Sequence, residues 1–406
     1  MVGCLDGTRV LELSRFQAGP RCGMQLSDLG AEVIKIEQPG GESNRGKPPF
    51  ADGQSIYFSV YNRGKKSLCL DMRKPEGKAI FLDLLKHTDF VLENYRPGTM
   101  EKMGLGYDEL CKVKPDIIML RVSSFGQYGP YKDLPGIDPV GQAMSGLMML
   151  TGRQENRPIQ TAFSLVDRTT ALNATIGALA ALLHRQKTGE GQIVDVCLLD
   201  AAMTMVEIPT SAFLSTGNQG EEGFRKAYKA KDGWVIVECV THESQKRAVV
   251  LIGRPNLFEE SNLAASHPLD TLSARKHPLM DALSAWCANH SVDEICREMR
   301  KIDVVVAPVL TIPEVSKSPH LWEREMMVKE RGPEGSDMYL PGLSIKFSKA
   351  PGRLGPVPAP GEHSDEILSR LLRYDGARIA ELHRSGIVTS KSAEPPPDRA
   401  STAGKR

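Results

Sequence analysis

The residue with the clearest chemical potential is Asp167, within the stretch Phe-Ser-Leu-Val-Asp-Arg-Thr at 163–169. An uncharged segment rich in alanine and leucine follows at 170–183, and this pattern predicts a buried helix. Asp167 would then lie at or near the helix N-terminus, where free backbone N–H groups and the helix dipole favour the ionised carboxylate and apolar neighbours exclude water. Such a carboxylate can act as a nucleophile, although an aspartate at this place is most often only a helix N-cap.

A second group of candidates consists of basic residues in loops that follow predicted strands. The loops at 62–66, 70–77 and 93–98 are rich in glycine, proline and cations. Ligands of open α/β sheets bind at the carboxyl ends of the strands, and clustered cations near helix N-termini suit a ligand with several phosphates. The alternative is that these side chains are solvated surface cations. The candidates are Arg63, Lys65, Lys66, Arg73, Arg96 and Lys102.

Other chemistries find little support. Ser145 lacks the first glycine of a GxSxG nucleophile elbow, and the nine histidines form no HExxH pair, so we predict no metal site. The loop after the first strand has no GxGxxG motif. Glu37 does end the second strand about where a ribose-binding acid would stand, but we predict no nicotinamide or flavin cofactor.

Composition narrows the class of protein. A chain of 406 residues with 41% hydrophobic content can bury a large core in two or three domains. A net charge of +1 favours neither nucleic acid nor an anionic membrane as a partner. No apolar run approaches the roughly 20 residues of a membrane span. The eight cysteines are scattered without a CxxC pair and indicate free thiols. We therefore expect a cytoplasmic protein, or one of the mitochondrial matrix if the source is eukaryotic.

The elements that must position these residues have an α/β pattern. A strand at 9–13, a loop at 14–23, a helix at 24–29 and a strand at 32–37 form a βαβ unit. Further strands are predicted at 67–71, 90–93, 117–122 and 192–196, with helices at 77–86 and 201–208.

A polar, glycine-containing segment at 215–223 predicts a domain boundary. We expect residues 1–215 to form the first part of a large Rossmann-like domain. Residues 225–325 form a smaller α/β domain, and 326–387 a return linker with C-terminal helices that pack on the large domain. Within the smaller domain the pattern predicts strands at 234–240 and 304–309 and helices at 244–252, 279–290 and 292–301. Residues 388–406 contain three consecutive prolines and few apolar groups, which predicts a disordered tail.

Six segments, in the same order from about residue 5 to 385, resemble the class III (CaiB/BaiF-type) coenzyme A transferases. Six motifs in register are far more specific than any one of them. They are Gln-Ala-Gly-Pro at 17–20, Gly-Ala-Glu-Val-Ile-Lys-Ile-Glu-Gln-Pro-Gly at 30–40, Asn-Arg-Gly-Lys-Lys-Ser-Leu at 62–68, Glu-Asn-Tyr-Arg-Pro-Gly at 93–98, Ser-Phe-Gly-Gln-Tyr-Gly-Pro at 124–130 and Thr-Gly-Glu-Gly-Gln at 188–192.

The resemblance implies a Rossmann-like large domain, a small domain and a homodimer whose two chains interlock. It implies that Asp167 is the catalytic nucleophile and that Asp138, where formyl-type enzymes have a glutamate, supports it. Gln38 departs from the arginine that formyl-CoA transferases carry there, which puts its contact in doubt. The implied coenzyme A contacts are Gln17, Ala18, Gln38, Leu70, Asp71, Met72, Arg73, Asn94, Tyr95, Arg96 and Lys102.

The implied reaction moves coenzyme A from an acyl-CoA to a free small carboxylic or dicarboxylic acid, such as succinate. The glycine-rich loop of formyl-CoA transferases is missing, which disfavours formyl-CoA with oxalate, and Arg225, Lys226 and Lys229 could contact an acidic substrate instead. Two alternatives remain. The related α-methylacyl-CoA racemases pair the aspartate with a histidine, where this chain has Ile137, and a non-catalytic coenzyme A-binding dimer would keep only the scaffold.

Overall fold

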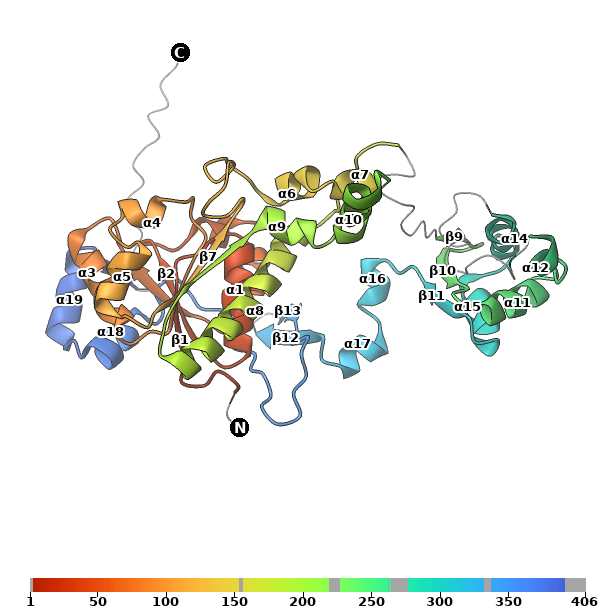
Figure 1. Cartoon of the computed structure of the whole chain (residues 1–406). Helices are drawn as coiled ribbons and strands as arrows, with labels where there is room; N and C mark the ends of the chain where they lie inside the picture. The colour runs from red at the N-terminus through yellow and green to blue at the C-terminus, as the bar shows by residue number, and fades with distance from the viewer. Residues whose placement is uncertain are drawn as a thin grey trace, which may run out of the picture. The chain divides into compact units, whose positions relative to one another are not determined.

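The computed structural model describes residues 3–152, 156–218, 227–261, 263, 277–331 and 337–390. The chain divides into two compact units, which are coloured along the sequence in Figure 1. The large unit consists of Met1–Val206 together with Trp322–Arg406, and the small unit of Glu207–Leu321. The large unit is therefore built from two parts of the chain that are far apart in sequence.

A seven-stranded sheet forms the centre of the large unit, with the order β14-β5-β2-β1-β6-β7-β8. All neighbouring pairs are parallel except β14 with β5. The six parallel strands follow the doubly wound Rossmann order, in which the direction of winding reverses between the first and fourth strands, here β1 and β6. The strands are β1 (Arg9–Glu12), β2 (Glu32–Glu37), β5 (Lys66–Leu70), β6 (Phe90–Glu93), β7 (Ile118–Ser123), β8 (Ile193–Cys197) and β14 (Val388–Thr389).

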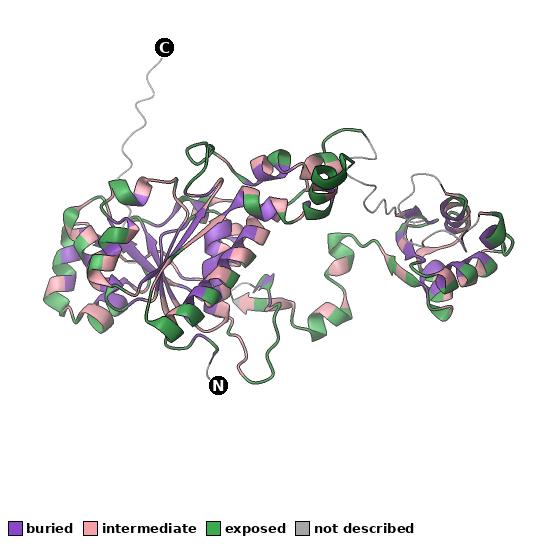
Figure 2. Ribbon diagram, viewed as in Figure 1, coloured by how far each residue is buried: buried purple, intermediate pink, exposed green. Residues whose placement is uncertain are grey.

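Helices cover both faces of this sheet, and Figure 2 shows the buried strands between them. Successive strand residues point to opposite faces, so Val10 belongs to one hydrophobic core and Leu11 to the other. One core contains residues of α1 (Ala18–Asp28) and α8 (Leu165–Thr188). The other contains residues of α3 (Pro75–Leu85), α5 (Tyr107–Val113), α18 (Ser364–Leu372) and α19 (Gly376–Arg384). The predicted α/β fold class is confirmed.

Helix α1 begins earlier than the sequence pattern suggests. The segment 14–23 was expected to be a loop, but α1 starts at Ala18 and so contains Gly19, Pro20 and Gly23. The glycine at 23 lets the helix approach β1, because an added Cβ there would lie 1.9 Å from Oε2 of Glu12. This glycine serves close packing rather than a turn.

Helix α8 is longer than predicted and is buried on one side only. Its buried side includes Val166, Ala171 and Ala174, which face the sheet. Leu172, Ile176 and Leu183 are instead exposed, with 46%, 64% and 57% of their surface accessible. We call these three residues the α8 stripe. The expectation of a wholly buried helix is therefore wrong for this face of the isolated chain.

Short elements complete the large unit. The predicted helix at 201–208 is interrupted, because α9 ends at Met203 and the next helix starts at Glu207. These elements are η1 (Ser43–Gly46), β3 (Phe50–Ala51), β4 (Gln54–Ser55), α2 (Ile56–Asn62), α4 (Thr99–Lys102), α6 (Asp138–Met144), α7 (Leu147–Thr151), α9 (Leu198–Met203), β12 (Met327–Arg331) and β13 (Asp337–Pro341).

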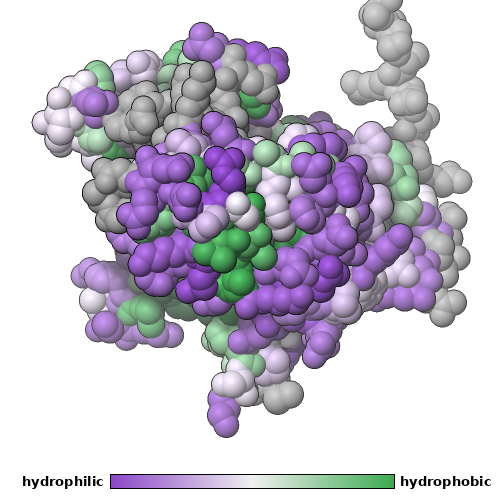
Figure 3. All heavy atoms as spheres, turned by 90° about the vertical axis from the view of Figure 1, so that its right-hand side faces the viewer, coloured by the Kyte–Doolittle hydropathy of each residue, from purple (hydrophilic) through white to green (hydrophobic). Residues whose placement is uncertain are grey.

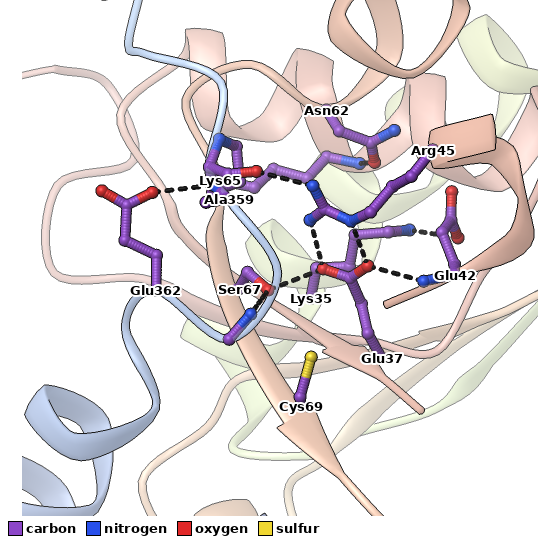
Figure 4. A network of polar contacts seen from close by, with 12 residues as sticks. Lys35, Glu37, Glu42, Arg45, Asn62, Lys65, Ser67, Cys69, Ala359 and Glu362 are labelled. Atoms are coloured by element: carbon purple, nitrogen blue, oxygen red, sulfur yellow. Dashed lines mark hydrogen bonds and ion pairs between the residues drawn. The ribbon is translucent and has the colours of Figure 1, made fainter. Parts of the chain in front are cut away.

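A polar network ties the C-terminal return segment to the first βαβ unit (Figure 4). The carboxylate of Glu37 accepts hydrogen bonds from Arg45 at 2.6 and 2.7 Å and from the Ser67 hydroxyl at 2.6 Å. Arg45 also donates to the Pro358 carbonyl at 2.8 Å, and Ser67 accepts the N–H of Gly361 at 2.8 Å. These bonds hold the return segment against β2 and β5.

The chain after this segment does not lose its structure at residue 388, where the predicted tail begins. Val388 and Thr389 form β14, which pairs with β5, and Val388 is fully buried. Apolar Ile387 and Val388 extend the core by one edge strand. Residues 391–406 lie outside the described part of the chain.

The small unit contains an antiparallel sheet of three strands, in the order β11-β10-β9. Its core joins this sheet to the helices around it, through residues such as Val235, Leu283 and Ile295. The elements are α10 (Glu207–Thr216), β9 (Tyr228–Lys229), β10 (Trp234–Glu238), α11 (His242–Leu251), α12 (Leu257–Glu260), α14 (Pro278–Cys287), α15 (Val292–Lys301), β11 (Val305–Pro308) and α16 (Ile312–Val315), with α17 (Pro319–Glu323) at its end.

In the described residues, no helix has the length and apolar character that crossing a membrane requires. Some hydrophobic residues are nevertheless exposed. Figure 3 shows a face of the molecule on which a compact group of them is surrounded by hydrophilic residues.

Candidate active site

A cavity of about 720 Å³ lies at the carboxyl end of the sheet in the large unit. Its walls come from the segments that follow β1 and β6, from the end of β7, and from the first turns of α6 and α8. Because β1 and β6 are the strands between which the winding reverses, this is where a doubly wound sheet opens a crevice for ligands.

Asp167 lines this cavity as the third residue of α8. The N-cap position is occupied by Ser164, so Asp167 is not the cap of this helix. We expected the helix N-terminus to favour the ionised form. Instead burial, followed by the charge of Asp138, raises the pKa of Asp167 to about 7, against an opposing effect of Arg168. Desolvation and the second carboxylate therefore outweigh the stabilisation of the ionised carboxylate.

Asp138 is the first residue of α6 and is only 3% exposed. One carboxylate oxygen accepts the backbone N–H of Asp167 at 3.0 Å, and the other accepts the side-chain amide of Gln142 at 2.5 Å. The Gln142 carbonyl oxygen in turn accepts the N–H of Thr161 at 3.0 Å. Asp138 thus fixes the first turn of α8, and Gln142 fixes Asp138.

Three side chains that the sequence analysis did not single out also line the cavity. Phe16 and Tyr57 line it together with Lys47. Asn94 joins the loops after β1 and β6, because its side chain accepts the N–H of Arg15 at 2.8 Å and donates to the Arg15 carbonyl at 2.7 Å. These residues come from separate loops, which the spacing in the sequence does not relate.

A second cavity, of about 320 Å³, lies beside the first on the large unit, and Tyr95 lines both. Four cations face it, Arg15, Arg73, Lys78 and Lys102. Every residue that the resemblance assigned to coenzyme A lies on one of the two cavities. Gln38, Leu70, Asp71, Met72, Arg73, Tyr95 and Lys102 line the smaller one, and Gln17, Ala18, Asn94, Tyr95 and Arg96 line the larger one.

Three of the candidate cations are engaged elsewhere. Arg63 pairs with Asp28, and Lys66 with Glu32 and Glu366. Lys65 lies 2.7 Å from Glu12, and burial lowers its pKa to about 8 although Glu12 opposes the shift. These side chains support the fold. The loop position that singled them out does not distinguish a cation that points into the sheet from one that points to a ligand.

The position that would distinguish a racemase is also on the cavity wall. Ile137 precedes α6, lines the cavity and is 66% exposed. Its side chain cannot exchange a proton.

Of the three cations expected near an acidic substrate, Lys229 lies in β9 of the small unit, whereas Arg225 and Lys226 lie outside the described residues. Within the described chain, no group of three acidic, histidine or cysteine side chains is placed to hold a metal ion.

The sequence matches the family described as CoA-transferase family III over residues 5–364. A succinyl-CoA:D-citramalate CoA-transferase of Chloroflexus aurantiacus is 34% identical over 95% of this chain and 98% of its own length. A succinyl-CoA:glutarate CoA-transferase of Mus musculus is 30% identical over 95% of this chain and 90% of its own. The crystal structure of a CaiB/BaiF family protein from Brucella suis superposes with a TM-score of 0.78 at 31% identity, over 91% of this chain and all of that one. The chain therefore belongs to CoA-transferase family III and is a transferase enzyme.

Proposed function

We propose that this enzyme moves coenzyme A from an acyl-CoA, such as succinyl-CoA, to a free small carboxylic or dicarboxylic acid, with Asp167 as the nucleophile. One observation carries the proposal. A half-buried carboxylate faces a cavity at the sheet's switch point, and a basic cavity that shares its Tyr95 wall lies beside it. The relatives that use succinyl-CoA with D-citramalate or glutarate support a dicarboxylic substrate.

The two cavities suit the two ends of an acyl-CoA. On the smaller cavity Lys102 is placed to bind phosphate groups, and Arg73 lies there paired with Asp71 at 2.7 Å. The pantetheine arm would pass Tyr95 and bring the thioester carbonyl to Asp167. The apolar residues of the larger cavity would exclude water from the reactive intermediates.

The chemistry follows from the carboxylate. Ionised Asp167 attacks the thioester carbonyl of the donor, so that an aspartyl–acyl anhydride forms and coenzyme A leaves as the thiolate. The thiolate then attacks the aspartyl carbonyl, which frees the donor acid and leaves a thioester between Asp167 and coenzyme A. An acceptor carboxylate attacks this thioester and forms a second anhydride. The released thiolate attacks its acyl carbonyl, giving the new acyl-CoA and free Asp167. Each step exchanges one acyl bond for another, so that no ATP is consumed.

We further propose that Asp138 and Gln142 are positioning residues, that the active form is an interlocked homodimer, and that the α8 stripe lies in its interface. An exposed apolar stripe of this kind is typical of a surface that another chain covers.

Free thiols at all eight cysteines suit a reducing compartment. We therefore place the enzyme in the cytoplasm, or in the mitochondrial matrix if its source is eukaryotic.

The test is incubation of the full-length enzyme with succinyl-CoA and a panel of free acids in deuterated water, followed by mass spectrometry. Our proposal predicts new acyl-CoA species and no deuterium at carbon 2 of the acyl group. Deuterium exchange without transfer would identify a racemase, and neither change would identify a non-catalytic coenzyme A-binding protein. Asp133→Asn, which removes an exposed carboxylate of the loop at 124–137, is the matched control for Asp167→Asn.

A further inference from the structure

The larger cavity poses an electrostatic problem for an acidic substrate. Asp167 and Asp138 both face it, and each is a carboxylate. A dicarboxylic acid brings two more negative charges. One of them belongs to the carboxylate that takes part in the reaction. The second remains throughout the reaction and is repelled by the site unless a cation faces it.

Three cations line the cavity, and they differ in their surroundings. Lys132 lies 3.6 Å from the Asp133 carboxylate and is about half exposed. Arg96 directly follows Tyr95, the residue that lines both cavities. In the described chain no ion pair joins either Arg96 or Lys47 to a carboxylate, and Lys47 differs from Arg96 in its aromatic neighbours. Its ammonium lies over two aromatic rings, 4.9 Å from the centroid of Phe16 and 4.8 Å from that of Tyr57.

Lys47 is held firmly at its backbone. Its N–H donates to the Asn44 carbonyl at 3.1 Å, and its own carbonyl accepts the Ser55 hydroxyl at 2.5 Å. The same hydroxyl accepts the N–H of Phe58 at 3.1 Å and so caps α2, the helix that carries Tyr57. One serine thus fixes the lysine relative to one of its aromatic neighbours.

The other aromatic neighbour adopts an unusual backbone conformation. Phe16 has a φ of 67°, in the left-handed region that non-glycine residues rarely occupy. Such strain is concentrated at ligand sites, where the surrounding structure holds a side chain in place. Here it sets the Phe16 ring beside Lys47 and directly before Gln17, which lines the same cavity. An aromatic pair leaves the lysine charge unneutralised while it restricts the side chain.

We propose that Lys47 is a specificity-determining residue, whose ammonium binds the second, non-reacting carboxylate of a dicarboxylic acid while the first reacts at Asp167. This inference rests on the proposed function and narrows its substrate class. Tyr57, whose ring Lys47 contacts, lines the same cavity as Asp167. The lysine would thus bind donor and acceptor acids alike, since each in turn occupies the same cavity.

The test compares Lys47→Met with the wild-type enzyme on acids matched in length, glutarate against pentanoate and succinate against butyrate. Acetyl-CoA serves as the donor, because an acetyl group has no second carboxylate. We expect Lys47→Met to lower kcat/KM for the dicarboxylates about 10- to 100-fold, mainly through KM, because a charge-assisted hydrogen bond is lost. The monocarboxylates should change less than about threefold, and Lys47→Arg should restore most of the preference for dicarboxylates.

Lys132→Met is the matched control, because it removes a cation of the same cavity that has a carboxylate neighbour. We expect it to change the ratio of dicarboxylate to monocarboxylate kcat/KM by less than about threefold. An equal loss with both classes of acid in Lys47→Met, or an equal shift in Lys132→Met, would overturn the inference while transfer by the wild-type enzyme upheld the proposed function. If the wild-type enzyme transferred coenzyme A to no acid at all, the proposed function and this inference would both be wrong.

Discussion

In the reaction that we propose, Asp167 must carry a negative charge, yet its surroundings oppose that charge. Burial contributes most to this and Asp138 comes second, and together they raise the pKa of Asp167 to about 7. A nucleophile whose pKa lies near neutrality is both available and reactive, because a carboxylate poorly stabilised in the ground state gains more when it forms a bond.

The pH dependence of the rate follows from this arrangement. Because Asp167 must lose its proton, kcat/KM for the acyl-CoA should rise with pH and level off above about 7. Asp138→Asn removes the neighbouring charge and keeps an acceptor for the Asp167 N–H, so the rising limb should move about one unit toward lower pH. Because burial still raises the pKa of Asp167, the rising limb should stay above the pH at which an ordinary aspartate ionises. Rate profiles from pH 4 to 9 would measure the shift, with Asp133→Asn as the control. An unchanged limb would show that Asp138 does not influence the nucleophile.

Gln142 offers a second test at this scale, because it is fully buried and donates to Asp138. Gln142→Leu leaves one Asp138 oxygen without this donor and frees the Thr161 N–H. We expect kcat to fall about tenfold with less change in KM, because Gln142 lines neither of the two cavities. A loss of folding alone would instead lower the active fraction and leave kcat per active site unchanged, which titration of active sites would detect.

The same carboxylate should also cost stability. An aspartate whose pKa is raised on folding binds its proton more tightly in the native state. Its contribution to the free energy of unfolding therefore decreases as the pH rises from about 4 to 7. Asp167→Asn removes that ionisation. We expect the Tm of the variant to exceed that of the wild type by about 2 °C at pH 8, with a smaller difference at pH 5. A variant less stable than the wild type at pH 8 would contradict the assigned environment of Asp167.

At the scale of elements, the loop after β1 depends on a buried ionic cluster. Glu12, at the end of β1, contacts Lys65 at 2.7 Å and Lys35 at 3.1 Å, and all three side chains are buried. Lys35 also donates to the Ser14 carbonyl at 2.9 Å. The cluster therefore fixes the start of the segment that leads to Phe16 and Gln17, and the close approach of Gly23 keeps it intact.

A methyl group at residue 23 tests this packing. Gly23→Ala would place Cβ against a Glu12 carboxylate that two lysines hold. Neither helix α1 nor the carboxylate can then move away easily. We expect a loss of about 2–3 kcal/mol in the free energy of unfolding, measured by denaturant titration. Gly376→Ala is the control, because this helical glycine has open space around its Cβ position and alanine favours the helix. Equal stability of the two variants would contradict the packing described for α1.

The sequence predicts some elements to the residue and misplaces others for physical reasons. The strands 32–37 and 90–93 agree with β2 and β6, because apolar runs bounded by charged or turn residues determine them. The start of α1 was missed because Gly19, Pro20 and Gly23 usually indicate a loop, and only the partner strand shows why glycine is needed. Lys47 was missed for a similar reason, since its importance depends on rings from two other segments.

For the whole molecule, the doubly wound sheet explains why residues far apart in the sequence meet. The loops after β1 and β6 meet at the switch point, and the return segment closes the same unit through Arg45 and Glu37. The sequence pattern predicts that the C-terminal helices return to the large domain, but it does not predict the contacts that join them to it. Composition alone gives no reason for residue 361 to bond to residue 67.

The α8 stripe makes a prediction about assembly. If Leu172, Ile176 and Leu183 are covered in a homodimer, Ile176→Glu should place a charge in the interface and shift the enzyme toward monomer. Light scattering after size-exclusion chromatography would measure the mass. Val250→Glu is the control, because Val250 is equally exposed, at 64%, but lies on α11 of the small unit. A monomeric wild type, or an Ile176→Glu dimer of unchanged stability, would contradict the proposed interface.

In the proposed reaction Asp167 becomes covalently joined to coenzyme A during turnover. To detect this bond, the enzyme is mixed with succinyl-CoA and quenched with hydroxylamine, and the modified peptide is identified by mass spectrometry. Hydroxylamine attacks the aspartyl thioester and releases coenzyme A, so we predict a hydroxamate at Asp167 and none in Asp167→Asn. A hydroxamate at another residue, or none while the enzyme is transferring coenzyme A, would contradict the account.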